Sequence, residues 1–160
     1  MKKLLLPLSI ATIVFASCGT KTETSTANSF SLDSAKAEIE AWNVKFEAAV
    51  KNKDSVGFVN LFAEDAVRMG PNAVSVEGRA NILKSVVAPL KVIGSTNLTM
   101  TDAMGDENTV TTFGTYEHFL NDGTPIEKGK YMGIFKRMDG KLVPIRDIWN
   151  SDAPAPALDK

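Results

Sequence analysis

The sequence predicts one α+β domain over residues 32–150, in which helices from the first half pack on one face of an antiparallel sheet from the second half. Two observations support this prediction. Apolar residues recur at helical spacing before Gly94, whereas after it apolar and polar residues alternate between short turns. Strands joined by short turns form an antiparallel meander, and helices gathered ahead of such a run are typical of the α+β class.

The first two helices have recognisable start signals. Ser31 or Asp33 can cap a helix whose buried stripe includes Trp42 and Phe46. Asp54 is a good N-cap for a second, shorter helix. Both segments are therefore expected to turn an apolar face toward the sheet.

A third helix follows two short strand-like pieces. The pieces are Ala66–Met69 and Val74–Val76, and turn residues separate them. The helix opens at Gly78 and carries an apolar side. Pro89 disfavours helical geometry in the residue before it, so we expect this helix to end near Ala88.

Four strands are expected in the second half. Turn residues at 106–108, 121–123 and 139–140 separate them, and Asp139-Gly140 is a strong hairpin signal. Pro144 lies inside the last strand and donates no ladder hydrogen bond, so we expect a sheet edge or a bulge there. The strands span approximately residues 98–104, 109–120, 129–137 and 142–149.

The N-terminal residues are typical of an export signal. A lysine pair precedes the apolar run 4–15, which is too short to span a bilayer. The run Phe15-Ala16-Ser17-Cys18 resembles the lipobox of bacterial lipoproteins, in which the cysteine is lipidated and becomes the new N-terminus. An ordinary secreted protein cut near Ala16 is the alternative. We expect a lipid on Cys18 to anchor the protein to a membrane of the bacterial cell envelope.

This interpretation divides the chain into four parts. Residues 1–17 are expected to be a lipoprotein signal peptide, and residues 18–31, rich in Thr and Ser, a flexible tether. Residues 32–150 form the domain, and residues 151–160, with two prolines among alanines, a loose C-terminal tail.

Composition argues against several classes of function. Cleavage before Cys18 leaves 16 basic against 19 acidic residues, a balance that disfavours a nucleic-acid partner. One histidine and one cysteine cannot make a nitrogen or sulfur metal cluster. The chain has no glycine-rich phosphate loop and no serine nucleophile elbow. We therefore expect neither a metal nor a cofactor.

Several stretches together resemble the nuclear transport factor 2-like superfamily, and within it the SnoaL-like domains of unknown function found in exported bacterial proteins. The resemblance runs from about Ala35 to Asn150. It implies a strongly curved antiparallel sheet wrapped around about three N-terminal helices, forming a cone with a pocket at its open end. Superfamily members also often form homodimers through the outer face of the sheet. The stretches are 52–54, 61–67, 78–79, 129–140 and 147–150.

One enzyme mechanism of the superfamily is disfavoured. Ketosteroid isomerase places a carboxylate base a few residues after the Asp-Ala pair that ends its second helix, and the matching position here is Gly70. The isomerase also has a tyrosine on its first helix, where this chain has none. A proton shuttle needs an acid or base within hydrogen-bond reach of the moving proton.

Asp147 is the first candidate for chemistry. It shares strand parity with an apolar set that should face inward, Val143, Ile145 and Trp149. Burial would raise the pKa of such a carboxylate unless a cation offsets it, and groups of that kind are candidates for catalysis. The alternative is a structural aspartate paired with Arg68, Arg79 or a backbone amide.

His118 and two tyrosines are further candidates. His118 shares parity with Tyr116 and could act as a base near neutral pH, or be an ordinary, partly exposed residue. Tyr116 and Tyr131 could donate hydrogen bonds into a pocket, or be core aromatics whose hydroxyls reach the surface. The expected pocket residues are Trp42, Phe46, Arg68, Met69, Tyr116, Tyr131 and Trp149.

Three functions fit these observations. The first is a membrane-tethered pocket domain that binds a small, largely apolar ligand or a protein partner. The second is a cyclase, isomerase or hydrolase that uses Asp147 with His118, Tyr131 or Arg68. The third is a structural or assembly role as a homodimer. The fold alone cannot identify a substrate, because it hosts many unrelated functions.

Overall fold

Three helices and six strands make up residues 30–154, the part of the chain that the computed structural model describes. The predicted signal peptide, Cys18 and most of the predicted tether lie outside these residues. Within them, no helix is long and apolar enough to cross a membrane. The helices are α1 (Leu32–Lys51), α2 (Ser55–Asn60) and α3 (Arg79–Val92). The strands are β1 (Val67–Met69), β2 (Val76–Glu77), β3 (Ile93–Gly105), β4 (Thr109–Leu120), β5 (Pro125–Met138) and β6 (Lys141–Ser151).

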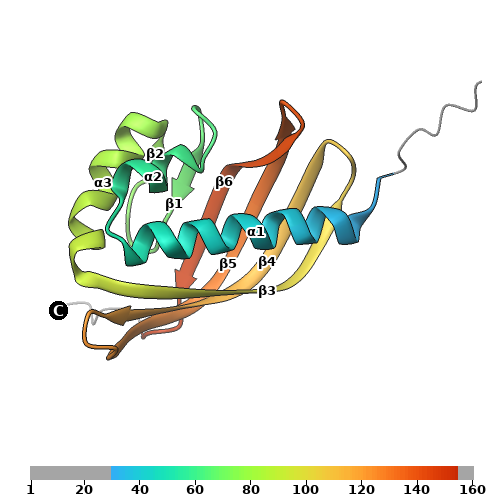
Figure 1. Ribbon diagram of the computed structural model, residues 1–160. Coiled ribbons are helices and arrows are strands. Elements are labelled where there is room, and N and C mark those ends of the chain that lie inside the picture. Colours follow the sequence, from blue (N-terminus) through green and yellow to red (C-terminus); the bar gives the residue numbers. More distant parts are fainter. Residues whose placement is uncertain (1–29, 155–160) are drawn as a thin grey trace, which may run out of the picture.

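The six strands form one curved, open sheet in the order β2-β1-β6-β5-β4-β3. Strands β3 to β6 form the predicted antiparallel meander. The sheet is mixed because β1 runs parallel to β6. In Figure 1, α1 lies across the long strands while α2 and α3 gather at the end of the sheet that carries β1 and β2. This arrangement confirms the predicted α+β class.

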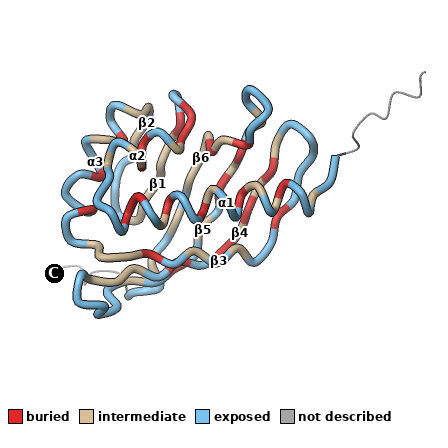
Figure 2. Tube along the Cα trace, in the orientation of Figure 1, coloured by how far each residue is buried: buried red, intermediate tan, exposed pale blue. Residues whose placement is uncertain are grey.

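Helix α1 follows from its capping residues and its periodicity. Ser31 is the N-cap, and its hydroxyl accepts a hydrogen bond from the Ser34 amide at 3.2 Å. Asp33 in the first turn and Lys51 in the last both complement the helix dipole. Buried residues recur along α1 (Figure 2). The stripe that they form is Ala35, Ile39, Asn43, Phe46, Ala49 and Val50.

Two apolar clusters meet at Trp42. One cluster packs Phe46 with α2, α3 and the fully buried Phe62, and the other packs the start of α1 against Phe135 of β5. The Trp42 ring contacts Phe62 and Phe135 edge-on, at centroid distances of 5.6 and 5.3 Å. Its indole nitrogen donates to the carbonyl oxygen of Leu61 at 2.9 Å. Trp42 therefore joins α1 to the sheet and to the segment after α2.

Helix α3 extends beyond its predicted end. We expected it to stop near Ala88, yet it runs through Pro89 to Val92. The reason is packing, because Leu90 is buried and continues the apolar stripe of Ile82 and Val86. The burial of a whole helical stripe outweighs the local preference that proline imposes on its neighbour.

Strand β6 contains the bulge that Pro144 predicted. Phe135 lies opposite Pro144 and Ile134 opposite Arg146, so Ile145 is an additional residue in the ladder. The strand is interior to the sheet, between β1 and β5, and not at its edge. The amide of Ala63 donates to the Pro144 carbonyl oxygen at 3.0 Å. The segment after α2 therefore supplies a hydrogen-bond donor to the backbone of this irregular stretch.

Candidate functional site

A cavity of about 390 Å³ lies between the helices and the inner face of the sheet. Such a volume is typical of small-molecule sites in proteins. Helices α1, α2 and α3 contribute apolar side chains, and β3 to β6 supply the opposite wall. Its aromatic lining residues are Trp42, Phe46, Phe58, Phe62, Tyr116, Tyr131, Phe135 and Trp149.

The sheet aligns several cavity side chains by register. Tyr131 lies opposite Trp149, and Gly133 lies opposite Asp147. Residues that face each other across a ladder share one face of the sheet. Because of the bulge at Ile145, Pro144 and Asp147 share one face of the ladder with β5. Val143 and Ile145, which were expected to share the face of Asp147, still pack against the buried core. Asp147 still faces the cavity, as expected.

Most residues singled out from the sequence meet at this cavity. Of the seven expected pocket residues, Met69 alone does not line it. Met69 pairs with Ile148 on the outer face, because adjacent strand residues alternate and Arg68 takes the inner face opposite Asp147. The predicted residues that do line the cavity are Trp42, Phe46, Arg68, Tyr116, His118, Tyr131, Asp147 and Trp149.

An ion pair forms the polar part of the wall. Arg68 Nε donates to Asp147 Oδ2 at 2.9 Å, and the two side chains are only 13% and 20% exposed. This pairing is one of the structural alternatives considered for Asp147. Arg79, the other arginine considered, instead donates from Nε and Nη2 to the Phe62 carbonyl oxygen, at 2.9 and 2.7 Å.

Two glycines make room for aromatic rings of the cavity. A Cβ at Gly70 would lie 2.6 Å from the Trp149 ring, and a Cβ at Gly114 would lie 2.5 Å from the Tyr131 ring. Side chains at these positions would therefore displace the rings. The Trp149 ring therefore occupies the space beside Gly70.

Asn43 is a cavity residue that the sequence reasoning missed. It is buried within the apolar stripe of α1, lines the cavity and donates from Nδ2 to Glu40 Oε2 at 3.2 Å. Burial raises the pKa of Tyr131 to about 12, with the carboxylate of Glu40 adding to the shift and hydrogen bonding with Asn43 opposing it. A polar residue in an otherwise apolar stripe was the available signal.

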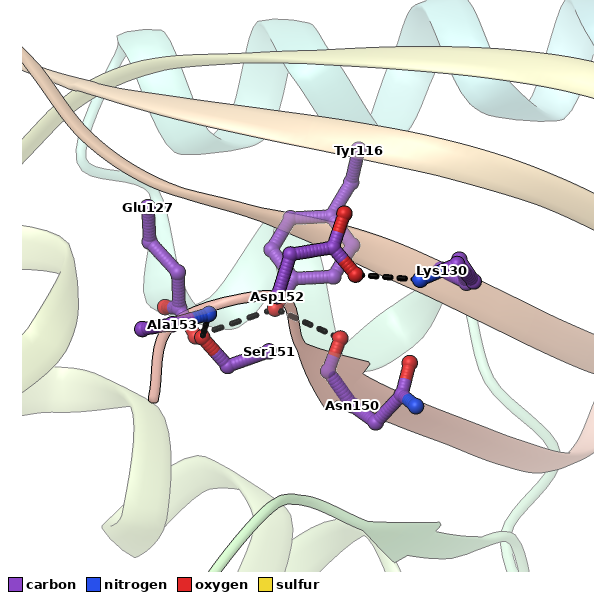
Figure 3. A network of polar contacts seen from close by, with 7 residues as sticks. All are labelled: Tyr116, Glu127, Lys130, Asn150, Ser151, Asp152 and Ala153. Carbon is purple, nitrogen blue, oxygen red and sulfur yellow. Dashed lines mark hydrogen bonds and ion pairs between the residues drawn. The ribbon is translucent and has the colours of Figure 1, made fainter. Parts of the chain in front are cut away.

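Tyr116 belongs to a polar network at the edge of the cavity (Figure 3). Its hydroxyl donates to Glu127 Oε1 at 3.0 Å and lies 3.3 Å from the Asn150 carbonyl oxygen. Burial, and then the hydrogen bond and charge of Glu127, raise the Tyr116 pKa. Beside it, Lys130 forms an ion pair with Asp152. The network ties β4, β5 and the end of β6 together and holds the Tyr116 ring in the cavity wall.

His118 is the next inward-facing residue after Tyr116 on β4. Their rings pack at a centroid distance of 4.8 Å. Burial lowers the pKa of His118, against an opposing effect of Glu127 across the ladder. Its Nδ1 is buried and has no hydrogen-bond partner among residues 30–154. His118 is therefore a neutral imidazole that could accept or donate one hydrogen bond.

The described residues show no metal site. Between residues 30 and 154, no group of three or more His, Cys, Asp or Glu side chains could hold an ion. The polar groups that line the cavity are the ion pair of Arg68 and Asp147, a neutral imidazole, two tyrosine hydroxyls, the Asn43 amide, the Ser85 hydroxyl and the Arg146 guanidinium. Such a set can bind and orient a molecule by hydrogen bonds, and only the imidazole is an unpaired base.

A curved, open sheet with helices on one face and a hollow between them defines the nuclear transport factor 2-like, or cystatin-like, class of fold. A protein profile of the SnoaL-like domain matches residues 44–145. The chain therefore belongs to the SnoaL-like domain family. A search of curated proteins finds no significant match.

Solved structures support the same fold. A ketosteroid isomerase-like protein from Erwinia carotovora is 14% identical, with 74% of this chain and 96% of that chain covered and a TM-score of 0.63. A protein of unknown function with a cystatin-like fold from Nostoc punctiforme is 19% identical, with 81% and 98% covered and a TM-score of 0.66. An NTF-2 like protein of unknown function from Shewanella oneidensis is 15% identical, with 72% and 98% covered and a TM-score of 0.63. At these identities the likeness shows the fold alone.

The buried imidazole generates a prediction about pH. Because burial holds the His118 pKa below its usual value of 6.5, the unfolded chain binds more protons than the folded chain as the pH falls through 6.5. The stability that His118 contributes should be fully present above pH 6.5 and decline below it. Unfolding free energy, measured from about pH 7.5 to about pH 5, should fall more for the wild type than for His118→Gln. An imidazole that titrates above 6.5 by NMR would contradict this.

Proposed function

We propose that this protein is a lipid-anchored pocket domain that binds one small, largely apolar molecule. The observation that carries this proposal is the 390 Å³ cavity, whose walls are mainly aromatic and aliphatic and in which Arg68 is paired with Asp147. A ligand site of this kind combines apolar walls with a few polar groups that set orientation. Burial of a ring system against these walls would supply most of the affinity.

An enzyme is the weaker candidate for the same cavity. Asp147, Tyr131 and His118 line one space, as catalysis by these residues would require. However, Asp147 is bound to Arg68, and a tyrosine with a pKa of about 12 is a weak acid at neutral pH. Only His118 is free to move a proton. The geometry therefore supports binding better than turnover.

Cys18 would hold this pocket at a membrane. Residues 18–31 would then form the spacer between the lipid and α1, which begins at Leu32. A chain of this length and composition spans several nanometres at most when extended. The pocket would accordingly work close to the membrane surface, where apolar molecules concentrate.

The lipid anchor can be tested by metabolic labelling. Cells that express the full chain and take up an alkyne fatty acid should incorporate the label into the wild type and not into Cys18→Ala. Mass spectrometry should place the mature N-terminus at Cys18 with diacylglycerol attached. A mature chain that begins near Ser17 and carries an unmodified thiol would contradict this proposal.

Binding can be tested with a neutral apolar fluorophore, N-phenyl-1-naphthylamine. The wild type should enhance its fluorescence saturably, with one site per chain. Leu98→Trp fills the cavity from β3 and should weaken binding about tenfold or more, because the added ring takes the place of the probe.

Thr99→Trp is the matched control. It adds the same ring at the next position of β3, which is exposed and lies on the outer face. This variant should bind the fluorophore like the wild type. Equal losses in both variants, or no saturable binding by the wild type, would count against the pocket.

A homodimer is a further proposal, supported by the outer face of the sheet. Four apolar residues from four strands pair in register there and form one row, which we call the outer row: Met69, Ile148, Met132 and Phe113. Ile148 and Met132 are 39% and 36% exposed. A row that crosses the strands can pack against the same row of a second copy related by a two-fold axis.

Sedimentation velocity tests the outer row. The wild type should sediment as a dimer at micromolar concentration, and Met132→Lys should be a monomer, because it places a charge in the middle of the apolar row. Val87→Lys changes an exposed apolar residue of α3 and should stay dimeric. A wild type that is monomeric at all concentrations would refute the proposal.

A further inference from the structure

Two buried polar atoms that face each other across the sheet have no hydrogen-bond partner. Among residues 30–154, Thr96 Oγ1 and His118 Nδ1 are the buried side-chain oxygen and nitrogen atoms that form no hydrogen bond. The two residues lie directly opposite each other in the ladder between β3 and β4, and Thr96 is only 2% exposed. Because an unpaired buried polar group is costly and rare, two of them on facing side chains indicate a shared partner.

Bulges beside this pair account for the missing direct bond. Gly94 is an additional residue in β3, two positions before Thr96, and Ile126 is an additional residue in β5, next to Glu127 opposite His118. A bulge bends its strand and disrupts the ladder locally. Facing residues of a ladder have Cβ atoms about 4.5–5.5 Å apart. Polar atoms on such a pair can therefore lie too far apart for a direct hydrogen bond and still be within reach of a single water molecule.

Counting donors shows which ring nitrogen such a water would leave protonated. A bridging water makes a hydrogen bond to each side chain, and the two bonds use two donors. With the imidazole proton on Nδ1, the ring, the Thr96 hydroxyl and the water supply four donors, so two stay unbonded within the bridge. With the proton on Nε2, three donors are present and one stays unbonded. Because an unbonded buried donor is destabilising, the bridge favours the proton on Nε2.

The other ring nitrogen, Nε2, is the one that a molecule in the cavity can reach. His118 lines the cavity, and Nε2 is not among the buried unpartnered atoms. Burial is the main cause that lowers the His118 pKa, while Glu127 across the ladder raises this pKa and Arg68 lowers it. The ring that faces the cavity near neutral pH is therefore uncharged and carries one proton.

We propose that Thr96 and His118 hold one buried water molecule between them, and that this bridge fixes the neutral imidazole with its proton on Nε2. The lone pair of the ring is then on the buried nitrogen, and the cavity meets an N–H donor. A general base must have its lone pair within hydrogen-bond reach of the proton that it removes. His118 can therefore orient a bound molecule but cannot remove a proton from it. Thr96, which does not line the cavity, is a positioning residue for His118.

Nitrogen NMR on the full chain tests the bridge, because His118 is the only histidine. The protein is produced with nitrogen-15 histidine and without a histidine tag, and spectra are recorded in detergent at about pH 8, where the ring is neutral. Couplings to the carbon-bound ring protons distinguish the two nitrogens. Nε2 should carry the proton, and Nδ1 should have the shift of an unprotonated nitrogen. A proton on Nδ1, or two averaged shifts, would overturn the proposal.

Variants of Thr96 assign the tautomer to the bridge. Thr96→Val removes the hydroxyl and keeps nearly the same shape, so the two nitrogen shifts should move toward each other as both tautomers become populated. Thr96→Ser keeps the hydroxyl and should give the wild-type spectrum. Thr99→Val makes the same change on the exposed outer face of β3 and should also leave the spectrum unchanged. A Thr96→Val spectrum identical to that of the wild type would refute the role of Thr96.

Thermal unfolding distinguishes a bonded hydroxyl from an orphan. With the bridge in place, Thr96→Val removes a partner of the water and should lower Tm by about 2–6 °C. Valine would instead relieve an orphan hydroxyl, so a raised Tm would contradict the proposal. If Thr96→Val does not fold, the wild-type spectrum and a high-resolution crystal structure decide, because one water should lie within hydrogen-bond distance of both atoms. These measurements report the ring alone, so failure of the fluorophore to bind would leave them unaffected.

Discussion

The packing of Trp42 is the interaction on which the rest of the structure depends. Its ring lies between the two apolar clusters, and its indole nitrogen bonds the Leu61 carbonyl oxygen, so a single side chain ties α1 to the sheet and to the segment that leads into β1. That segment carries Arg68 to its place opposite Asp147. The same ring also forms part of the cavity wall. Core and site are therefore built from one set of contacts.

The cavity survives because its polar groups have local partners or are neutral. Arg68 is paired and stacked, the Tyr116 hydroxyl bonds Glu127, and Asn43 bonds Glu40. A charge buried without a partner would be costly, and this cost explains why Arg68 is paired with Asp147 and why the His118 imidazole is neutral. Close packing within the walls, with Trp149 against Gly70, keeps them from collapsing inward. A preformed space of this kind suits recognition of a ligand that is itself rigid.

Sequence reasoning located most of the site but not its details. The alternation of side chains along each strand was sufficient to predict that Asp147, Tyr116 and His118 share the inner face of the sheet. It did not show the bulge in β6, where the additional residue Ile145 shifts the ladder with β5 while Val143 and Ile145 still pack against the buried core. It also failed where neighbours in a strand were both assigned to the pocket, since only one of Arg68 and Met69 can face inward. Asn43 was missed because the helical pattern is recognised from apolar residues alone, and a buried amide among them does not contribute to it.

The sequence by itself determined the α+β class, the order of helices and strands and the resemblance to SnoaL-like domains. These features follow from short-range periodicity, caps and turn residues, which act over a few neighbours in the chain. Tertiary structure alone decided that α3 continues past Pro89 and that Arg68 meets Asp147, which lies 79 residues further along the chain. It also decided that the aromatic rings surround a hollow instead of filling it. Such features depend on the curvature of the sheet and on its register, which only the packing of distant segments determines.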